Sequence, residues 1–544
     1  MTQYRKNDII ELNIIDMSHD GEGIGKTDAF IWFVKDTVIG DRVRAKVVKV
    51  GKNYGYARLV DIIEGSPDRV EPPCPIARRC GGCTLQQLRY DNQLAYKEQK
   101  VKNNLIRIGG FDKALVASIY EGIVGMEHPY RYRNKAQFPI GKAGDIIAGY
   151  YAGRTHDIIA CDDCLIGDEI NKDIVGAVIG HMKKYDIEPY DETLGTGLVR
   201  HVLVRKAYAT GDLMCCIVAT SMKIPYADEL ADSLAALGVT NFVININKER
   251  TNVILGEKQV CARGDGYITD YIGDIRFRIS AKSFYQVNPQ QTRILYETAI
   301  SYAGLSGQEV VWDLYCGIGT ISLSMARSAR QVIGVEVVEE AIADAIENAR
   351  INNITNTQFI CGRAEDIVQS LPHPDVIVVD PPRKGCDRKC IQTMLDIEPS
   401  RIVYVSCDSA TLARDLKMLC ESGKYELKRV KVVDMFPQTG HVETVVLFSK
   451  GEIDSKKVRV EFSLENMDMS GFQKGATYPQ IKEYVQEHSG LKVSSLYISQ
   501  VKRKCGLDVG QNYNLSKKED TKQPQCPPEK EKAIMAALKY FGML

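Results

Sequence analysis

The segment Glu309-Val-Val-Trp-Asp-Leu-Tyr-Cys-Gly-Ile-Gly319 reads as a buried strand that runs into a glycine loop at the start of a helix. Further continuous apolar runs follow, as expected of parallel strands that are covered on both faces. These runs are Gln331–Glu336, Thr357–Cys361, Asp375–Asp380 and Arg401–Val405. A helix is expected over Glu339–Ile351. The alternation of strands and helices predicts a doubly wound, Rossmann-like α/β domain over residues 286–450.

Two late apolar runs, Val430–Met435 and Val442–Phe448, flank a short segment that contains Pro-Gln-Thr-Gly. Runs separated by so short a turn segment favour an antiparallel hairpin. We expect this hairpin at the end of the sheet.

The glycine loop predicts a binding site for one nucleoside. Glu336 ends the next strand, where a carboxylate can accept hydrogen bonds from both hydroxyls of a ribose. A dinucleotide loop would carry a third glycine for the pyrophosphate, and this chain has Ile321 there. S-adenosylmethionine therefore fits better than a dinucleotide. Asp380, in Asp380-Pro-Pro-Arg383, ends the fourth strand and adds a carboxylate at the same edge.

Cys407 ends the strand Val403-Tyr-Val-Ser-Cys407 and precedes a predicted helix. A helix N-terminus lowers the pKa of a nearby thiol, which favours a nucleophile here; a buried structural cysteine is the alternative. C5 of a pyrimidine accepts a methyl group only after a nucleophile has added at C6. A base must then remove the C5 proton. Glu443, at the start of a late strand, is the candidate base.

The remaining chain indicates further domains, because 544 residues exceed one core. Residues 1–64 alternate apolar and polar positions, which predicts a small β-barrel. Arg42–Arg58 holds six basic residues and no acidic one, with Tyr54 and Tyr56 among them. This composition suits a single nucleic-acid strand, or equally a solvated face.

Residues 65–285 are predicted to form a middle domain, mostly of strands, with helices near Tyr96–Ile108 and Ala227–Leu237. Residues 451–544 are predicted to be a helical extension. Within it, Tyr478–His488 and Ser495–Lys504 could form a helix-turn-helix, but a packing appendage is favoured.

Charge and apolar patterning exclude several classes of protein. Lysine plus arginine equals aspartate plus glutamate, at 70 each, so a nucleic-acid surface must be a local patch. No apolar run is long enough to span a membrane, and the N-terminus lacks the apolar core of a signal peptide. We therefore expect a cytoplasmic protein without a membrane partner. In this setting its 16 cysteines indicate reduced thiols, catalysis or metal binding.

A compact cysteine cluster lies early in the middle segment. Cys74, Cys80 and Cys83 fall within ten residues, and Cys161-Asp-Asp-Cys164 could supply a fourth thiolate. Four thiolates can hold zinc or an iron–sulfur cluster, and spacing does not decide between them.

Several motifs, in this order, resemble those of the S-adenosylmethionine-dependent RNA (uracil-5-)-methyltransferases. They are Phe284-Tyr-Gln-Val-Asn288, Asp313-Leu-Tyr-Cys-Gly317, Asp380-Pro-Pro-Arg383, Ser406-Cys407-Asp408 and His441-Val-Glu443. The chain is most similar, over about residues 1–450, to the iron–sulfur branch that acts on 23S ribosomal RNA.

The resemblance implies residue roles. It implies that the cofactor is contacted by Gln286, Tyr315, Glu336 and Asp380. Cys407 would be the nucleophile and Glu443 the proton acceptor. A [4Fe-4S] cluster would be held by Cys74, Cys80, Cys83 and Cys164, with Cys161 as the rival fourth ligand. The N-terminal barrel would be an OB-like, RNA-binding TRAM domain.

Three functional hypotheses follow. The first is methylation of a uridine at C5 in 23S rRNA, and the second is the same chemistry on tRNA. The third, from another class, is a non-catalytic RNA-binding iron–sulfur protein, against which the presence of both Cys407 and Glu443 argues. The expected partner is RNA and not DNA. Arg131 and Arg133 are further candidate RNA contacts.

Overall fold

The computed structural model describes residues 4–27, 30–153, 155–367, 371–450, 477–507, 525–541 and 543–544. The chain divides into two compact units, Met1–Ile453 and Asp454–Leu544. The predicted extension includes residues 451–476 and 508–524, which lie outside the described residues.

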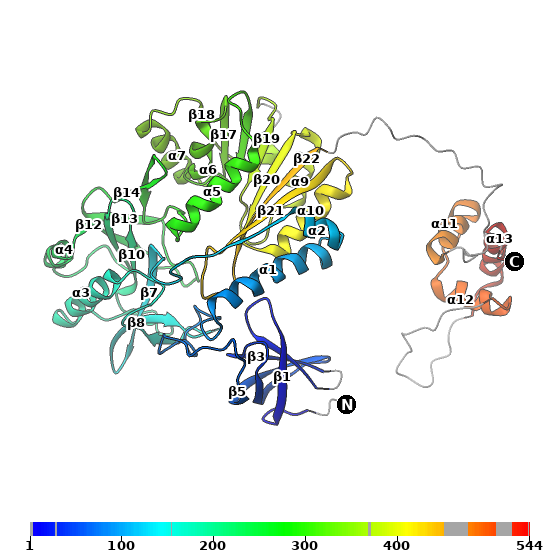
Figure 1. The fold of residues 1–544 in the computed structure, drawn as a ribbon, viewed down its shortest axis with the longest axis horizontal. Coiled ribbons are helices and arrows are strands. Elements are labelled where there is room, and N and C mark those ends of the chain that lie inside the picture. The colour runs from blue at the N-terminus through cyan, green and yellow to red at the C-terminus, as the bar shows by residue number, and fades with distance from the viewer. Residues whose placement is uncertain are drawn as a thin grey trace. The chain divides into compact units, whose positions relative to one another are not determined.

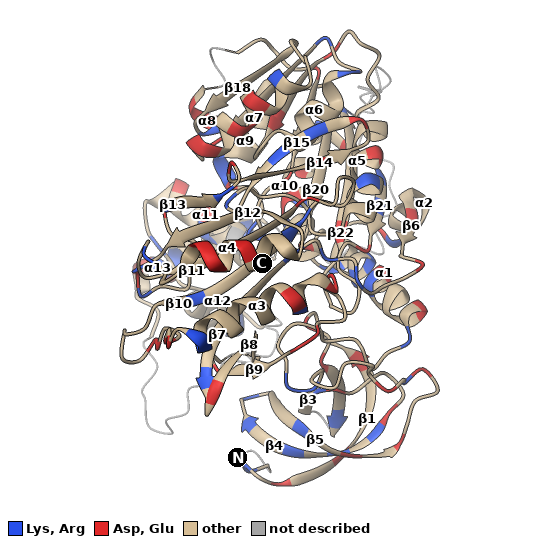
Figure 2. Cartoon of the chain, turned by 90° about the vertical axis from the view of Figure 1, so that its left-hand side faces the viewer, with Lys and Arg blue, Asp and Glu red and all other residues tan. Residues whose placement is uncertain are grey.

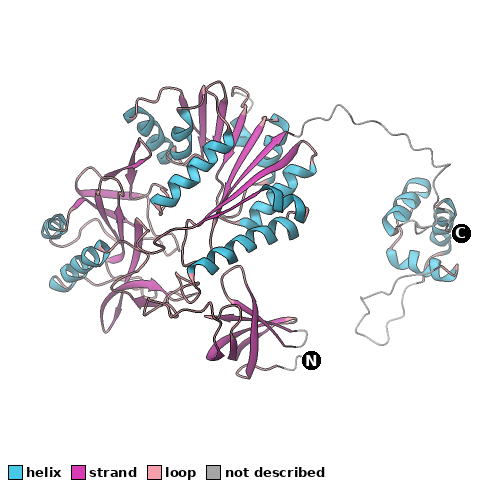
Figure 3. Cartoon of the chain, viewed as in Figure 1, coloured by secondary structure: helices cyan, strands magenta, loops and turns pink. Residues whose placement is uncertain are grey.

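The first unit begins with a closed five-stranded barrel (Figures 1 and 3). Its strands, in chain order, are β1 (Ile9–Met17), β2 (Gly23–Thr27), β3 (Phe30–Lys35), β4 (Arg42–Val50) and β5 (Tyr54–Glu64). Alternate residues such as Leu12 and Val43 point into the barrel, which confirms the predicted period of two. Basic residues lie along β4 and β5 (Figure 2), and Arg44 pairs there with Asp61 at 2.6 Å.

A seven-stranded sheet of order β13-β12-β11-β10-β7-β8-β9 forms the middle of this unit. Its strands are β7 (Lys135–Ala143), β8 (Asp145–Tyr151), β9 (Ile158–Ala160), β10 (Val199–Lys206), β11 (Leu213–Ala219), β12 (Val239–Ile246) and β13 (Lys258–Arg263). The helices α3 (Ile170–Lys184) and α4 (Ala227–Ala236) pack against it. The sequence predicted α4 but not α3. A small hairpin of β14 (Tyr267–Ile272) and β15 (Ile275–Ser280) follows.

The third part is an eight-stranded sheet of order β18-β17-β16-β19-β20-β22-β21-β6 (Figure 1). Its parallel core consists of β16 (Val310–Leu314), β17 (Gln331–Glu336), β18 (Thr357–Cys361), β19 (Val376–Val379) and β20 (Arg401–Ser406). The predicted antiparallel hairpin is present as β21 (Tyr425–Val433) and β22 (Glu443–Lys450). It does not end the sheet, because β6 (Tyr120–Val124) pairs in parallel with β21. The predicted middle segment, residues 65–285, therefore contributes strands to three sheets.

Helices cover both faces of this sheet, as a doubly wound fold requires (Figure 3). Successive residues of β16 serve opposite faces, with Val311 in one core and Trp312 in the other. The Val311 face is covered by α5 (Pro289–Ala303) and α6 (Thr320–Ala326). The Trp312 face is covered by α1 (Tyr90–Arg107), α2 (Lys113–Ile119), α9 (Arg388–Ile397) and α10 (Ser409–Glu421). Two further helices are α7 (Glu339–Ile351) and α8 (Ala364–Ile367).

The strand order reverses between β16 and β19. In open α/β sheets a ligand crevice lies at such a switch point, outside the carboxyl ends of the strands. The fold therefore places a crevice beside the glycine loop and Asp380.

The second unit contains α11 (Tyr478–Ser489), α12 (Ser495–Lys504) and α13 (Pro528–Tyr540), packed around their own apolar core. Lys502 is buried and lies over the Tyr478 ring, and Lys504 forms an ion pair with Glu531. Both of these lysines near the end of α12 therefore make contacts within the unit.

None of the helices in the described residues is both long enough and apolar enough to cross a lipid bilayer.

Candidate active site

One cavity of about 1380 Å³ lies at the carboxyl ends of the parallel strands. Its wall includes all the residues predicted for catalysis and for cofactor binding, namely Gln286, Tyr315, Glu336, Asp380, Cys407 and Glu443. The fold thus brings together residues that lie up to about 160 positions apart in the chain. Their individual roles stay predictions.

The glycine loop between β16 and α6 turns through left-handed backbone conformations. Tyr315, Gly317 and Gly319 have φ angles of 71°, 54° and 84°. A Cβ on Gly319 would lie 3.1 Å from the Phe359 ring, so a side chain there would also push against this ring. A Cβ on Gly317 would meet no atom within 4 Å and would fill the space that the loop leaves open.

Glu336 is held against this loop by backbone donors. The amides of Gly317, Val337 and Val338 donate to its carboxylate at 3.3, 2.7 and 3.1 Å. The same wall includes the apolar residues Val335 and Val337. A fixed carboxylate, an open glycine backbone and apolar neighbours fit a nucleoside with a ribose diol.

Raised pKa values are found for Asp380 and Glu443, which line the cavity, and for Asp313, which is buried next to Asp380. Burial raises the pKa of Asp313 to about 7, although Ser322 Oγ donates to it at 2.5 Å. Burial, with the nearby charge of Asp313, raises the pKa of Asp380 to about 7. Burial, with the charge of Asp380, raises the pKa of Glu443 well above its ordinary value. The buried Glu443 Oε2 has no hydrogen-bond partner among the described residues, so one of its oxygens is free to receive a proton.

Cys407 lies at the end of β20, directly before Asp408, the N-cap of α10. The prediction that the helix lowers its pKa is wrong for the free protein. Burial, followed by the charges of Glu443 and Asp380, raises the pKa of the thiol to about 12, against the opposing effect of Arg383. The helix offers little compensation, because the amides of Ala410 and Thr411 both donate to the Asp408 carboxylate at 2.9 Å.

The cavity wall also contains residues outside the predicted catalytic and cofactor-binding sets. Phe436 and His441 come from the loop between β21 and β22, and Arg383 follows β19. Burial and the charges of Arg383 and Lys100 lower the pKa of His441 to about 4, so its ring is neutral at pH 7. For His441 the motif His441-Val-Glu443 was the available signal, because it places this residue two positions before the candidate base.

The two arginines proposed as RNA contacts differ in their surroundings. Arg133 lines the cavity. Arg131 instead forms a bidentate ion pair with Asp163, at 2.6 and 2.7 Å, and donates to the Cys164 carbonyl. Arg131 therefore braces the cysteine-rich loop.

Five cysteines gather near that loop. Burial, and then the neighbouring thiols of Cys164, Cys80 and Cys74, raise the pKa of Cys83 to about 12. Burial, and then the neighbouring thiols of Cys164, Cys74 and Cys80, raise the pKa of Cys161 to about 12. Within the described ranges, no group of three or more His, Cys, Asp or Glu side chains is arranged to hold a metal ion. The thiols lie close enough to raise one another's pKa values, and a bound metal ion would have to displace their protons.

Comparisons with known proteins agree with this geometry. The tRNA (uracil-5-)-methyltransferase family model matches residues 227–374 and 372–451, and the TRAM domain model matches residues 5–60. An uncharacterized RNA methyltransferase of Clostridium acetobutylicum is 47% identical over 453 residues, which are 82% of this chain and 98% of that protein. One of Halalkalibacterium halodurans is 48% identical over 450 residues, with 81% and 97% covered.

Among solved structures, the chain resembles the tRNA (uracil-54, C5)-methyltransferase of Pyrococcus abyssi in complex with S-adenosyl-L-homocysteine. The TM-score is 0.66 at 26% identity, with 80% of this chain and 99% of that chain covered. These matches confirm the predicted N-terminal TRAM barrel and the methyltransferase fold. The chain therefore belongs to the TRAM-containing uracil-5 RNA methyltransferases, a family of S-adenosylmethionine-dependent enzymes.

Proposed function

We propose that this enzyme methylates C5 of a uridine in 23S rRNA through a covalent adduct between Cys407 and C6. The observation that supports this most directly is the single cavity that Cys407 and Glu443 share with Gln286, Tyr315, Glu336 and Asp380. A thiol, a buried carboxyl group and a nucleoside-shaped cradle in one cavity supply the groups that the chemistry needs.

S-adenosylmethionine supplies an electrophilic methyl group when it is bound. The chain's part is to bind it, with Glu336 accepting hydrogen bonds from the ribose hydroxyls and Gly317 allowing close approach. The remaining cofactor contacts are assigned to three residues that line the same cavity, Gln286, Tyr315 and Asp380. Because the target base is stacked in RNA, it must be flipped out or already unpaired.

Cys407 releases its proton to solvent water as the sulfur–C6 bond forms, and the resulting enolate makes C5 the nucleophile. After methyl transfer, Glu443 removes the C5 proton and the sulfur–C6 bond breaks. The raised pKa of Glu443 makes it a stronger base than an exposed carboxylate once it is ionised. Arg383 favours the thiolate form of Cys407.

A 5-fluorouridine-containing RNA tests this mechanism. Fluorine cannot leave as a proton does, so the wild-type enzyme should remain covalently attached to the RNA. Cys407→Ala should form no adduct yet bind S-adenosylmethionine normally. The absence of an adduct with an RNA that the enzyme demonstrably methylates would contradict the mechanism, and the absence of methylation of any RNA would favour a non-catalytic RNA-binding protein.

The rival substrate is tRNA, which the descriptions of the matching family model and of the Pyrococcus abyssi enzyme favour. The resemblance of the cysteine cluster and barrel to the rRNA-acting branch favours 23S rRNA. Mapping 5-methyluridine in both RNAs after deletion of the gene separates the two. Loss confined to 23S rRNA supports the proposal, and loss confined to tRNA refutes it.

For the cysteines we propose a structural [4Fe-4S] cluster on Cys74, Cys80, Cys83 and Cys164, with zinc as the alternative occupant. This proposal is supported by the proximity of these thiols in the folded chain. Iron, sulfide and zinc should be quantified in protein purified without oxygen. Cys164→Ser should lose the metal and Cys161→Ser should keep it; the reverse result would exchange their roles.

A further inference from the structure

One face of α1 carries polar side chains at a helical spacing of three and four residues. They are Gln93, Tyr96, Lys97, Lys100 and Asn104. Each of them forms a hydrogen bond with a segment outside the helix. Residues at this spacing lie on the same side of a helix, so α1 contacts several segments with one surface.

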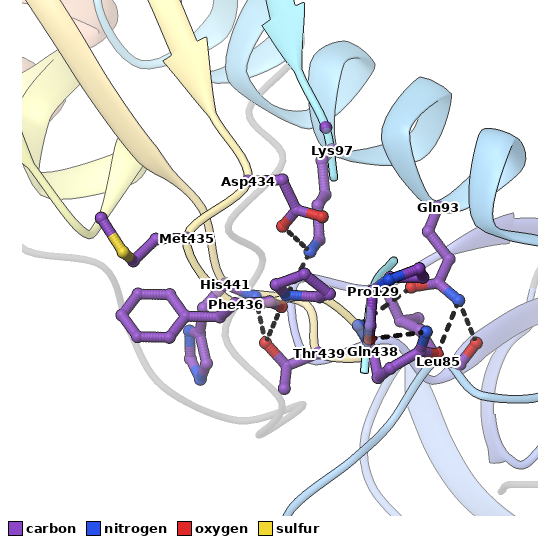
Figure 4. A network of polar contacts seen from close by, with 12 residues as sticks. Leu85, Gln93, Lys97, Pro129, Asp434, Met435, Phe436, Gln438, Thr439 and His441 are labelled. Carbon is purple, nitrogen blue, oxygen red and sulfur yellow. Dashed lines mark hydrogen bonds and ion pairs between the residues drawn. The ribbon is translucent and has the colours of Figure 1, made fainter. Parts of the chain in front are cut away.

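The central contact is a buried ion pair. Lys97 and Asp434 are both fully buried, with Lys97 Nζ 2.5 Å from Asp434 Oδ1 and 3.0 Å from the Phe436 carbonyl (Figure 4). Tyr90 donates to the second Asp434 oxygen at 2.7 Å. A buried ion pair usually stabilises a fold no better than apolar residues of equal volume would. A role in placing a particular segment is therefore a better explanation than stability alone.

That segment is the loop that leads to the candidate base. Val433 and Glu443 are cross-strand partners in the β21–β22 ladder, so Asp434 directly follows the partner of Glu443. The same loop contributes Phe436 and His441 to the cavity wall. Lys97 thus binds the loop at the end nearest the base.

A second contact holds the middle of this loop. The Gln93 side chain donates to Gln438 Oε1 at 3.0 Å and accepts from the Gln438 amide at 3.1 Å (Figure 4). Gln438 has a φ angle of 69°, a conformation that is costly for a non-glycine residue and needs such support.

The helix α1 also contacts the barrel and the start of α10, the helix that follows Cys407. Tyr96 donates to the Ser18 carbonyl, and Lys100 donates to the carbonyls of His19 and Gly440, at 2.5, 3.1 and 2.8 Å. Asn104 donates at 2.8 Å to Ser409, two residues after Cys407. One helix therefore contacts the loop that leads to Glu443, the helix that follows Cys407 and a loop of the barrel.

We propose that Lys97, through Asp434, is a positioning residue that directs Glu443 toward the C5 proton, so that its loss slows release of the covalent adduct more than it slows RNA or cofactor binding. This inference rests on the proposed function. Lys97 itself does not line the cavity.

Lys97→Met, Asp434→Asn and the double variant test it. All three should bind S-adenosylmethionine as the wild type does and keep KM for RNA within about twofold, while kcat falls on the order of 100-fold. The covalent enzyme–RNA adduct should accumulate with ordinary uridine, as it should in Glu443→Gln, where the C5 proton cannot be removed. The double variant leaves no unpaired buried charge, so it should regain thermal stability and still accumulate the adduct.

Lys102→Met is the matched control, because Lys102 lies on the same helix and pairs with Glu98 near the surface. It should turn over normally without adduct. A double variant that is stable and turns over at the wild-type rate would overturn the inference while leaving the proposed function intact. If Glu443→Gln releases methylated RNA normally, the base assignment fails, and the positioning role fails with it.

Discussion

The charge state of Cys407 is the property of a single residue on which the chemistry most depends. With a pKa raised to about 12, the thiol should react with iodoacetamide slowly at pH 7 and about tenfold faster per pH unit above that. At alkaline pH, where these carboxyl groups are ionised, Asp380→Asn and Glu443→Gln should each accelerate the reaction, because each removes a negative charge that raises this pKa. Peptide mass spectrometry reports the rate, with exposed Cys361 as the internal control. Equal rates in all three proteins would contradict the account.

Asp380 provides a second test, through stability. Because its folded pKa is raised from 3.8 to about 7, its protonated form contributes stability below about pH 4, and this contribution is lost as the pH rises through about 7. Asp380→Asn cannot titrate. Its melting temperature relative to the wild type should therefore rise between pH 4 and pH 8 in cofactor-free protein. Asp396→Asn, at an exposed position, is the control and should show no such trend.

The sequence predicted the position of Cys407 but not its protonation. The motif locates the thiol before a helix, whereas its pKa depends on Glu443 and Asp380, which come from other strands of the sheet. Lys97 was missed for a similar reason. Gln93 and Lys97 continue the buried row of Val101 and Leu105, yet a lysine reads as a solvated residue until Asp434 is known to face it.

Among the structural elements, the glycine loop before α6 allows a controlled substitution. Gly317→Ala and Gly423→Ala both place a side chain on left-handed backbone in open space, so each should cost about 1 kcal/mol of folding free energy. Only Gly317 lines the cavity. Calorimetry should show weakened S-adenosylmethionine binding for Gly317→Ala alone. Equal affinities in the two variants would exclude this loop from the cofactor site.

The sequence predicted the strands that are buried on both faces, because their apolar runs are continuous. The helix α7 also has the predicted bounds. Other elements were missed for physical reasons. Gly176 and Gly180 weaken the helical signal of α3, although Ile174, Val178 and Met182 recur at four-residue spacing. β6 is short and contains Gly122, and only its pairing with the distant β21 makes it a strand.

For the whole molecule, the division after Ile453 predicts that the second unit is dispensable for chemistry. The two bacterial relatives align over nearly their whole length with only 81–82% of this chain. A protein ending at Ile453 should therefore bind S-adenosylmethionine and form the adduct with 5-fluorouridine RNA as the full chain does. Gel-shift and calorimetric measurements check this. Loss of adduct formation in a folded truncated protein would assign the second unit a part in RNA capture.

The edge position of β6 has a consequence for biosynthesis. Tyr120 pairs with Val430, so this strand leaves the ribosome about 300 residues before its partner. At a translation rate of roughly 5–20 residues per second, the backbone groups of β6 stay unpaired for on the order of 15–60 s. Nascent chains with unpaired strands are prone to aggregate during such a period. Chaperone demand during translation should therefore peak before the last hairpin emerges, and a circularly permuted gene that encodes the two partners closer together should shorten that interval.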